Sequence, residues 1–239
     1  MKKKKNYLLE KVTEIFRNEK PGRLLDLGCG DGDYSVRLGE LGFQVTAADL
    51  DGERFRYRDA IEFKNCDVTQ ALPFTDASFD YVVFLEIIEH LKNPYSVVSE
   101  LHRILKPKGR LVCSTPNILN LRSRARFLME GIYEFFREPP LDQMNNPKEK
   151  KFNLHIVPYR FHELEYWLHE GGLAVEGIHA SICEGYGWSF LVPFIRAQAF
   201  LKERRSNKKK GLDFSRIHRI LHSKELLYGR HLIVKAVKT

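Results

Sequence analysis

The sequence has few cysteines, and their spacing gives them no evident structural use. Four cysteines are spread through 239 residues, and no two of them form a Cys-x-x-Cys pair. Such spacing offers neither a zinc site nor a disulfide framework. We therefore expect a protein of the reducing cytoplasm whose fold is held by its apolar core.

Long apolar runs are also absent, and acidic residues are in the minority. No run reaches the length of a membrane span, and the N-terminal lysines lead into an amphipathic segment rather than a secretory signal. Lys and Arg number 39 against 31 Asp and Glu, and the excess is concentrated in residues 1–5 and 202–210. Two readings fit these basic blocks, a solvated surface or an anionic partner such as a lipid surface or nucleic acid. Peripheral contact with the inner membrane surface is therefore one expectation.

Apolar strand patterns alternate with helical ones from residue 23 onward. The expected strands are 23–27, 43–50, 61–67, 79–85, 110–114, 173–180 and 231–237, and the expected helices are 4–18, 34–41, 93–105, 118–137, 160–170 and 187–203. This alternation predicts a doubly wound α/β fold with a mostly parallel, seven-stranded sheet. We expect a single domain over 1–239, with an N-terminal amphipathic helix in 1–20. The helical insertions 118–160 and 184–226 are expected to form a lid or the acceptor site.

The stretch 24-LLDLGCGDGDYS-35 breaks an apolar strand into three alternate glycines. A dinucleotide fingerprint would need a third glycine at Asp33, and a P-loop would need a Gly-Lys-Ser/Thr ending. Asp26, Asp31 and Asp33 would also repel a pyrophosphate. They suit a positively charged ligand without phosphate, such as S-adenosylmethionine, which carries a sulfonium and an ammonium group.

Four later segments follow this loop in a consistent order: 43-FQVTAADLD-51, 65-NCDVT-69, 79-FDYVVFLEIIEHL-91 and 103-RILKPKGRLVCSTPN-117. Together with the loop they resemble class I S-adenosylmethionine-dependent methyltransferases, and the resemblance implies their Rossmann-like fold. It implies that Asp26 anchors the cofactor's amino group, that Asp49 accepts the ribose hydroxyls, and that Asp67 and Val68 meet the adenine. The full implied cofactor set is Asp26, Gly28, Gly30, Gly32, Tyr34, Asp49, Leu50, Asp67, Val68 and Glu86.

The exit from the fourth predicted strand carries Glu86, Glu89 and His90. At positions i, i+3 and i+4 of a helical turn, these side chains would share one face and could hold a divalent ion. The set resembles the E-x-x-E-H arrangement of ubiquinone-biosynthesis and small-RNA 2′-O-methyltransferases, which implies Mg²⁺ near the acceptor oxygen. The alternative is an acceptor contact or a structural role without metal. The expected catalytic residues are His90, His155 and Glu89.

The resemblance implies a methyltransferase, and the acid–histidine exit favours O-methylation of a small-molecule or lipid-like hydroxyl acceptor. Two alternatives stay open: an RNA 2′-O-methyltransferase and a non-catalytic S-adenosylmethionine-binding regulator. Nucleic acid is the less favoured partner because no RNA-binding module is evident. The apolar-to-basic segment 188–210 is a lid over the acceptor, a buried helix or an element lying on anionic lipid.

Overall fold

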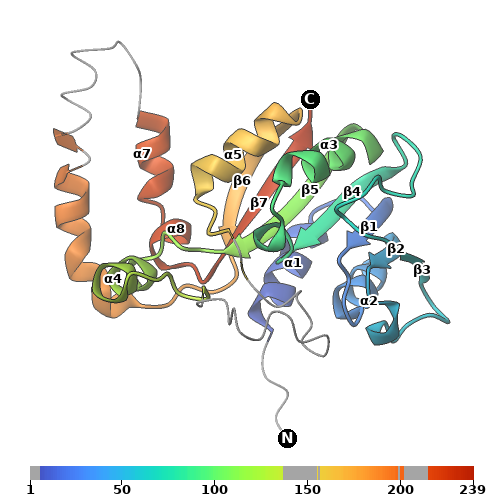
Figure 1. The fold of residues 1–239 in the computed structure, drawn as a ribbon, viewed down its shortest axis with the longest axis horizontal. Helices are drawn as coiled ribbons and strands as arrows, with labels where there is room; N and C mark the ends of the chain where they lie inside the picture. The colour runs from blue at the N-terminus through green and yellow to red at the C-terminus, as the bar shows by residue number, and fades with distance from the viewer. Residues whose placement is uncertain (1–5, 137–154, 156, 199, 202–214) are drawn as a thin grey trace, which may run out of the picture.

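The computed structural model describes residues 6–136, 155, 157–198, 200–201 and 215–239. Within these residues, seven strands form one sheet in the order β3-β2-β1-β4-β5-β7-β6. Strand β7 runs antiparallel to both of its neighbours, and the remaining pairings are parallel. The expected doubly wound, mostly parallel seven-stranded sheet is confirmed (Figure 1).

The strands are β1 (Arg23–Leu27), β2 (Gln44–Asp49), β3 (Glu62–Asn65), β4 (Phe79–Leu85), β5 (Leu105–Pro116), β6 (Leu173–Ala180) and β7 (His231–Lys238). The α-helices are α1 (Tyr7–Arg17), α2 (Asp33–Gly39), α3 (Pro94–Ile104), α4 (Leu121–Glu130), α5 (Phe161–Glu170), α7 (Ser215–Leu221) and α8 (Lys224–Tyr228). In the described part of the chain, 3₁₀ turns are η1 (Gly52–Arg54), η2 (Ile88–His90) and η4 (Tyr186–Leu191), and residues 192–198 and 200–201 are helical.

Alternate side chains of the central strands enter two separate cores. In β1, Leu24 packs with side chains of α1 and α2, whereas its neighbour Leu25 packs with side chains of α3 and α5. In β4, Val83 and Val82 divide between the same two cores. Because successive strand residues point to opposite faces, this pattern covers the sheet with helices on both sides (Figure 1).

Helix α1 lies within the segment where an N-terminal amphipathic helix is expected. Asn6 caps it by accepting a hydrogen bond from the Leu9 N–H at 3.0 Å. Its buried face ends in Phe16, whose ring meets Phe43 and Tyr81 edge to face, with centroids 5.3 and 5.6 Å away. The helix is therefore fixed to the sheet through an aromatic cluster.

Two expected helices differ from the structure. The helix predicted over 118–137 is shorter, because α4 ends at Gly131, which takes a left-handed conformation (φ 75°) suited to a helix C-cap. The segment predicted as a helix over 187–203 begins as the 3₁₀ turn η4 before it becomes α-helical. Parts of both expected insertions (137–154, 156, 199 and 202–214) lie outside the described residues.

Among the described helices, none has the length and apolar character needed to cross a bilayer.

The aromatic anchor of α1 makes a testable contribution to stability. Phe16 is 1% exposed, so Phe16→Ala should lower the free energy of unfolding by about 3–5 kcal/mol, as large-to-small core substitutions do. Urea unfolding measures this loss. The control is Leu128→Ala on α4, where the side chain is 86% exposed and a change within about 0.5 kcal/mol is expected. Equal losses in both variants would contradict the assigned packing.

Candidate functional site

The first group of site residues lies at the carboxyl ends of β1 and β2. Asp26 is 3% exposed and accepts a hydrogen bond from the Ser35 hydroxyl of α2 at 2.6 Å. Burial, reinforced by the nearby charges of Asp49 and Asp31, raises the pKa of the Asp26 carboxyl to about 6. A buried carboxylate in such surroundings is stabilised by an incoming cation.

The glycine loop runs from β1 to α2, and its three glycines have positive φ angles of 81°, 55° and 89°. A Cβ added at Gly30 would meet no atom within 4 Å, so open space adjoins the backbone there. A Cβ at Gly28 would instead lie 2.6 Å from the Ile87 side chain. Only Gly30 therefore offers room for a ligand to approach, while Gly28 is required by packing against the turn after β4. Gly32 forms the left-handed N-cap of α2.

Asp49, at the end of β2, holds the glycine loop in place. Its two carboxylate oxygens accept the N–H groups of Gly30 and Asp51, each at 2.9 Å. A carboxylate has about four acceptor positions, so lone pairs remain for the two ribose hydroxyls that the family resemblance implies for Asp49. The next residue, Leu50, is 42% exposed and presents an apolar side chain beside the same strand end.

Three further predicted cofactor residues follow β3 or lie on α2. One oxygen of Asp67 accepts both the backbone N–H and the hydroxyl of Thr69 at 2.8 Å. Val68 packs against the main core. Tyr34 is on α2, and burial raises the pKa of its phenol, so it remains uncharged near neutrality.

The two acids at the surface of the glycine loop share one basic partner. Asp31 and Asp33 both form ion pairs with Arg56, at 3.0 and 2.6 Å. One guanidinium offsets one of these two negative charges, so the loop keeps a net negative charge. Asp26 and Asp49 add their carboxylates to it at the ends of β1 and β2.

A second group of predicted residues gathers Glu89, His90 and His155, each of which offers one ligand atom within 4.8 Å of the others. Glu89 is 0% exposed, and neither of its carboxylate oxygens has a hydrogen-bond partner. One of these oxygens lies 4.0 Å from Nε2 of His155. The His90 and His155 rings meet edge to face with centroids 4.9 Å apart. Among the described residues, this is the one cluster of such groups that could hold a metal ion.

Glu86 does not share a helical turn with Glu89 and His90, contrary to expectation. Its backbone is left-handed (φ 55°), and the 3₁₀ turn η2 begins only at Ile88. Its carboxylate accepts the Ser114 hydroxyl at 2.7 Å, and its other oxygen lies 3.8 Å from Nε2 of His231. The Glu86 side chain thus contacts residues of β5 and β7, while its charge still acts on the nearby Glu89.

The environment favours uncharged imidazoles on this side of the site. Burial and the neighbouring His90 lower the pKa of His155. Burial, together with the charges of Arg230 and His155, lowers the pKa of His231 to about 4. Burial also raises the pKa of Glu89, and the nearby Glu86 adds to this effect. Neutral imidazole accepts a proton or binds a metal, so His155 and His231 suit either role.

Three polar partners of the site escape sequence reasoning. Ser35, Ser114 and His231 contact Asp26 or Glu86, as described above. Ser35 closes the glycine-rich stretch, Ser114 ends a predicted strand and His231 begins one, but no spacing rule indicates which acid each of them meets. His231 enters from the C-terminal region because β7 inserts next to β5, with His231 opposite Pro116.

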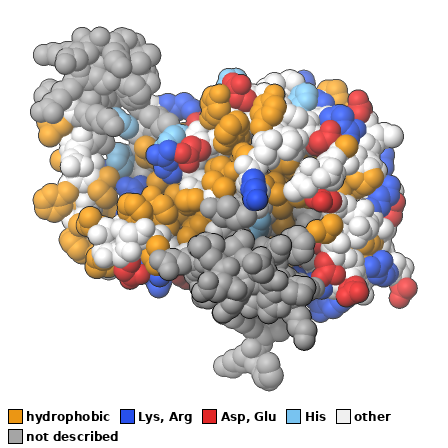
Figure 2. Space-filling view, in the orientation of Figure 1, with side chains coloured by type: hydrophobic (Ala, Val, Ile, Leu, Met, Phe, Trp, Pro, Cys, Tyr) orange, Lys and Arg blue, Asp and Glu red, His pale blue; other side chains and the backbone are white. Residues whose placement is uncertain are grey.

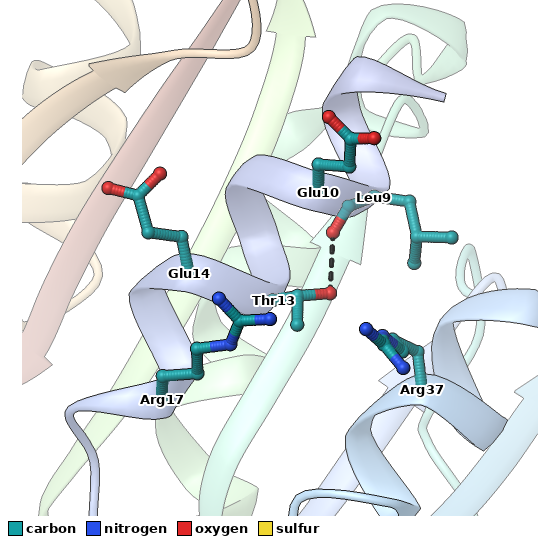
Figure 3. A pocket seen from close by; sticks show the side chains of 6 residues that line it. All are labelled: Leu9, Glu10, Thr13, Glu14, Arg17 and Arg37. Atoms are coloured by element: carbon teal, nitrogen blue, oxygen red, sulfur yellow. Dashed lines mark hydrogen bonds between the residues drawn. The ribbon is translucent and has the colours of Figure 1, made fainter. Parts of the chain in front are cut away.

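A surface hollow of about 580 Å³ lies elsewhere. It is lined by Leu9, Glu10, Thr13, Glu14, Arg17 and Arg37, between α1 and α2 (Figure 3). Figure 3 shows the Thr13 hydroxyl turned toward the Leu9 carbonyl, to which it donates a hydrogen bond at 2.7 Å. No residue from a strand end lines this hollow, so we do not assign it to cofactor or acceptor binding.

Residues 1–177 match the model of a family described as a methyltransferase domain. The chain belongs to this methyltransferase domain family. It is 28% identical over 179 residues to the ubiquinone biosynthesis O-methyltransferase of Xanthomonas euvesicatoria, covering 68% of this chain and 66% of that protein. The protein of the same name from Rickettsia bellii is 32% identical over 118 residues, 47% of this chain and 49% of that one. The chain thus spans between about half and two thirds of the length of these relatives.

Solved structures confirm the methyltransferase fold. A SAM-dependent methyltransferase from Archaeoglobus fulgidus superposes with a TM-score of 0.59 at 18% identity, covering 96% of this chain and 94% of that one. The 1,6-didemethyltoxoflavin-N1-methyltransferase of Burkholderia thailandensis, solved with S-adenosylhomocysteine, gives 0.55 at 15% identity and covers 97% and 78%. Family membership confirms the expected class and supports S-adenosylmethionine as the methyl donor.

Asp26→Asn should affect stability and cofactor binding in opposite directions. The pKa of Asp26 is raised from 3.8 to about 6, so ionisation of this carboxyl opposes folding. The protonated carboxyl favours the folded state, and this contribution to stability is lost as the pH rises through about 6. The variant should therefore gain up to about 2–3 kcal/mol of unfolding free energy at pH 7. It should also lose about 10- to 100-fold in S-adenosylmethionine affinity, since a charge-assisted hydrogen bond is removed.

Calorimetry and urea unfolding at pH 5 and 7 measure both effects. In the wild type, the affinity should fall as the pH drops below about 6, because the carboxylate that receives the cation becomes protonated. Asp31→Asn, at the ion pair with Arg56, is the matched control and should change either quantity little. Wild-type cofactor affinity in Asp26→Asn would overturn the assignment.

Proposed function

We propose that the chain transfers a methyl group from S-adenosylmethionine to a hydroxyl group of a small-molecule or lipid-like acceptor. The observation that carries this proposal is the pairing of two buried acidic centres at adjacent strands. Asp26 lies near the end of β1, and its buried carboxylate suits a cationic cofactor. Glu89 with two imidazoles follows β4, and this group suits deprotonation of a hydroxyl. The O-methyltransferase names of the curated relatives support the same acceptor chemistry.

Each group has a separate task in this proposal. Asp26 binds the cofactor's ammonium group, and Asp49 positions the ribose while it holds the Gly30 N–H. The methyl group is already activated by the sulfonium, so the protein must mainly align the acceptor oxygen and remove its proton. His90, His155 and Glu89 are the groups placed to receive that proton.

The Glu89, His90 and His155 group also fits a divalent metal ion. Both oxygens of Glu89 are buried without a partner, which is unfavourable unless something binds them. A bound ion would lower the pKa of an acceptor hydroxyl. One carboxylate and two imidazoles suit a borderline ion such as Mn²⁺ or Zn²⁺ better than Mg²⁺, which prefers oxygen ligands. We therefore propose that the metal ion of this site, where the reaction uses one, is Mn²⁺ or Zn²⁺ rather than Mg²⁺.

Glu89→Gln should separate cofactor binding from turnover. We expect kcat for methylation of a catechol panel to fall about 100-fold or more, because proton transfer or metal binding is lost, while S-adenosylhomocysteine binds as before. Dialysis against a chelator followed by Mn²⁺, Zn²⁺ or Mg²⁺ identifies any metal requirement. Release of S-adenosylhomocysteine with any of these acceptors would exclude a non-catalytic regulator.

The control is Glu130→Gln on α4, whose carboxylate pairs with Arg126. Full activity of Glu89→Gln would remove this residue from the reaction. Full activity after chelation would exclude the metal and leave the imidazoles as the proton acceptors.

We further propose that one end of the molecule contacts an anionic membrane surface. Exposed apolar side chains gather on α4, η4 and the helix that follows, and we call them the apolar end: Phe127, Leu128, Met129, Tyr186, Phe190, Phe194, Phe200 and Leu201. Figure 2 shows hydrophobic side chains at the left of the molecule, the side on which α4 lies in Figure 1. Arg196 is exposed within it, and six of the nine residues that follow in sequence, 202–210, are Lys or Arg. Apolar side chains flanked by positive charge favour an interfacial position on anionic lipid.

Vesicle co-sedimentation tests this surface. The wild type should bind vesicles of phosphatidylcholine with phosphatidylglycerol more strongly than vesicles of phosphatidylcholine alone. The double variant Leu128→Ser/Phe194→Ser, at sites 86% and 71% exposed, should lose most of this binding because burial of apolar area drives insertion. Tyr166→Ser on α5, 54% exposed, is the control. If the double variant binds these vesicles as strongly as the wild type does, the apolar end serves another partner.

A further inference from the structure

A chain of polar side chains connects the end of β6 with the end of β4. Oγ of Ser181 lies 2.7 Å from Nδ1 of His231. Nε2 of the same ring lies 3.8 Å from one carboxylate oxygen of Glu86, and the other oxygen accepts the Ser114 hydroxyl at 2.7 Å. The strands β5, β7 and β6 that carry these partners are adjacent in the sheet. Glu86 is therefore contacted from two strands, and one of its contacts is itself held by a third.

The register of the strands builds the contact between Ser181 and His231. Ala180 lies opposite Leu232 at the end of the antiparallel β6–β7 pairing. The next residue outward is Ser181 on one strand and His231 on the other, and their side chains meet there. On its other side, His231 lies opposite Pro116 at the end of β5. The backbone thus fixes where the imidazole begins.

The imidazole of His231 is held at its face as well as at its edge. Phe135 stacks on the ring, with centroids 6.1 Å apart. Burial lowers the pKa of His231 to about 4, so the ring is neutral near pH 7 and carries one proton. In a neutral imidazole one nitrogen donates and the other accepts, and the partner of one nitrogen decides the role of the other. The Ser181 hydroxyl therefore governs what Nε2 presents to Glu86.

The backbone of Glu86 is strained, with a φ of 55° in the left-handed region that favours glycine. A residue with a side chain persists in this region where its surroundings hold it, and such residues cluster at functional sites. The charge of Glu86 acts on Tyr34, one of the predicted cofactor residues, and on Glu89, one of the proposed proton acceptors. Its carboxylate thus lies between the two groups that the methyl transfer must bring together.

We infer that Ser181 and His231 are positioning residues for the proposed methyl transfer, on which this inference rests. The Ser181 hydroxyl donates to Nδ1, so the proton of the ring stays on Nε2 and faces the Glu86 carboxylate. This N–H and the Ser114 hydroxyl fix the orientation of the carboxylate and favour its charged form. The oriented negative charge then favours the cationic methyl donor at its boundary with the acceptor.

The ¹⁵N NMR signals of the imidazole test this tautomer without any turnover. In the wild type, His231 should carry its proton on Nε2, and its signals are identified by their loss in His231→Phe. Ser181→Ala should shift the ring toward a mixture of both tautomers, whereas Ser181→Thr, which keeps the hydroxyl, should preserve the wild-type tautomer. A wild-type proton on Nδ1, or an unchanged tautomer in Ser181→Ala, would overturn the inference.

Calorimetry with the two forms of the cofactor separates positioning of a charge from a merely structural role. His231→Phe keeps an aromatic ring beside Phe135 but loses both polar contacts. It should lower the affinity for cationic S-adenosylmethionine about 3- to 10-fold, as loss of one hydrogen-bonding partner does. The affinity for S-adenosylhomocysteine, which lacks the sulfonium charge, should stay close to that of the wild type. Equal losses for both ligands would show that His231 only supports the fold.

Kinetics with the catechol panel measure the effect on the reaction. Groups that orient a site residue typically change activity about 10- to 100-fold, so His231→Phe should lower kcat by this factor. His231→Gln should recover part of kcat, because its amide N–H can replace the one on Nε2. Full kcat in a folded His231→Phe, checked by thermal unfolding, would remove the residue from the reaction.

The matched control is His169→Phe on α5, where the histidine is exposed. It should leave kcat, both affinities and the tautomer of His231 unchanged. If the wild type methylates none of the catechols, the proposed function fails, while the NMR signals and the two affinities still decide the roles of Ser181 and His231. Methylation by the wild type, with His231→Phe equal to it in every readout, would keep the proposed function and overturn this inference.

Discussion

Buried carboxylates at the ends of two adjacent strands are the constraint around which this site is built. Asp26 and Glu89 are almost completely removed from water, and burial raises the pKa of each. Among the described residues, neither carboxylate forms an ion pair with a lysine or arginine at hydrogen-bonding distance. An uncompensated buried acid costs folding free energy. The fold therefore carries a cost at both strand ends that a cationic ligand or a metal ion would offset.

The sites of Asp26 and Glu89 are joined through packing, because β1 and β4, the strands that precede their loops, are neighbours in the sheet. Asp26 lies opposite Val83 in the β1–β4 pairing, so the loops that follow both strands emerge side by side. Ile87 occupies the space where Gly28 would have a Cβ, and the turn with Glu89 and His90 begins one residue later. The cofactor loop and the acid–histidine turn thus share a packed contact. A larger residue at position 28 would displace both.

Sequence reasoning succeeded where the information is local. The bounds of β1, β4 and β6 agree with the expected strands, because short apolar runs between turn residues mark buried strands. It failed where distant segments decide the outcome. Arg56, more than twenty residues away, pairs with both Asp31 and Asp33, and no spacing rule indicates that pairing. The left-handed backbone at Glu86 prevents the helical turn that the E-x-x-E-H spacing suggests. A single residue in this conformation leaves no trace in the spacing of side-chain types along the sequence.

The distribution of charge along the sheet edge follows the chemistry of the proposed reaction. Carboxylates dominate beside β1 and β2, where Asp26 and Asp49 lie, and a cationic methyl donor is favoured there. Beyond β4 the acids Glu86 and Glu89 are joined by imidazoles of lowered pKa, at His155 and His231, and by the guanidinium of Arg230. Methyl transfer removes the sulfonium charge from the cofactor, so the acidic side favours the donor over its product. The neutral imidazoles on the other side remain able to take up the proton that the acceptor releases.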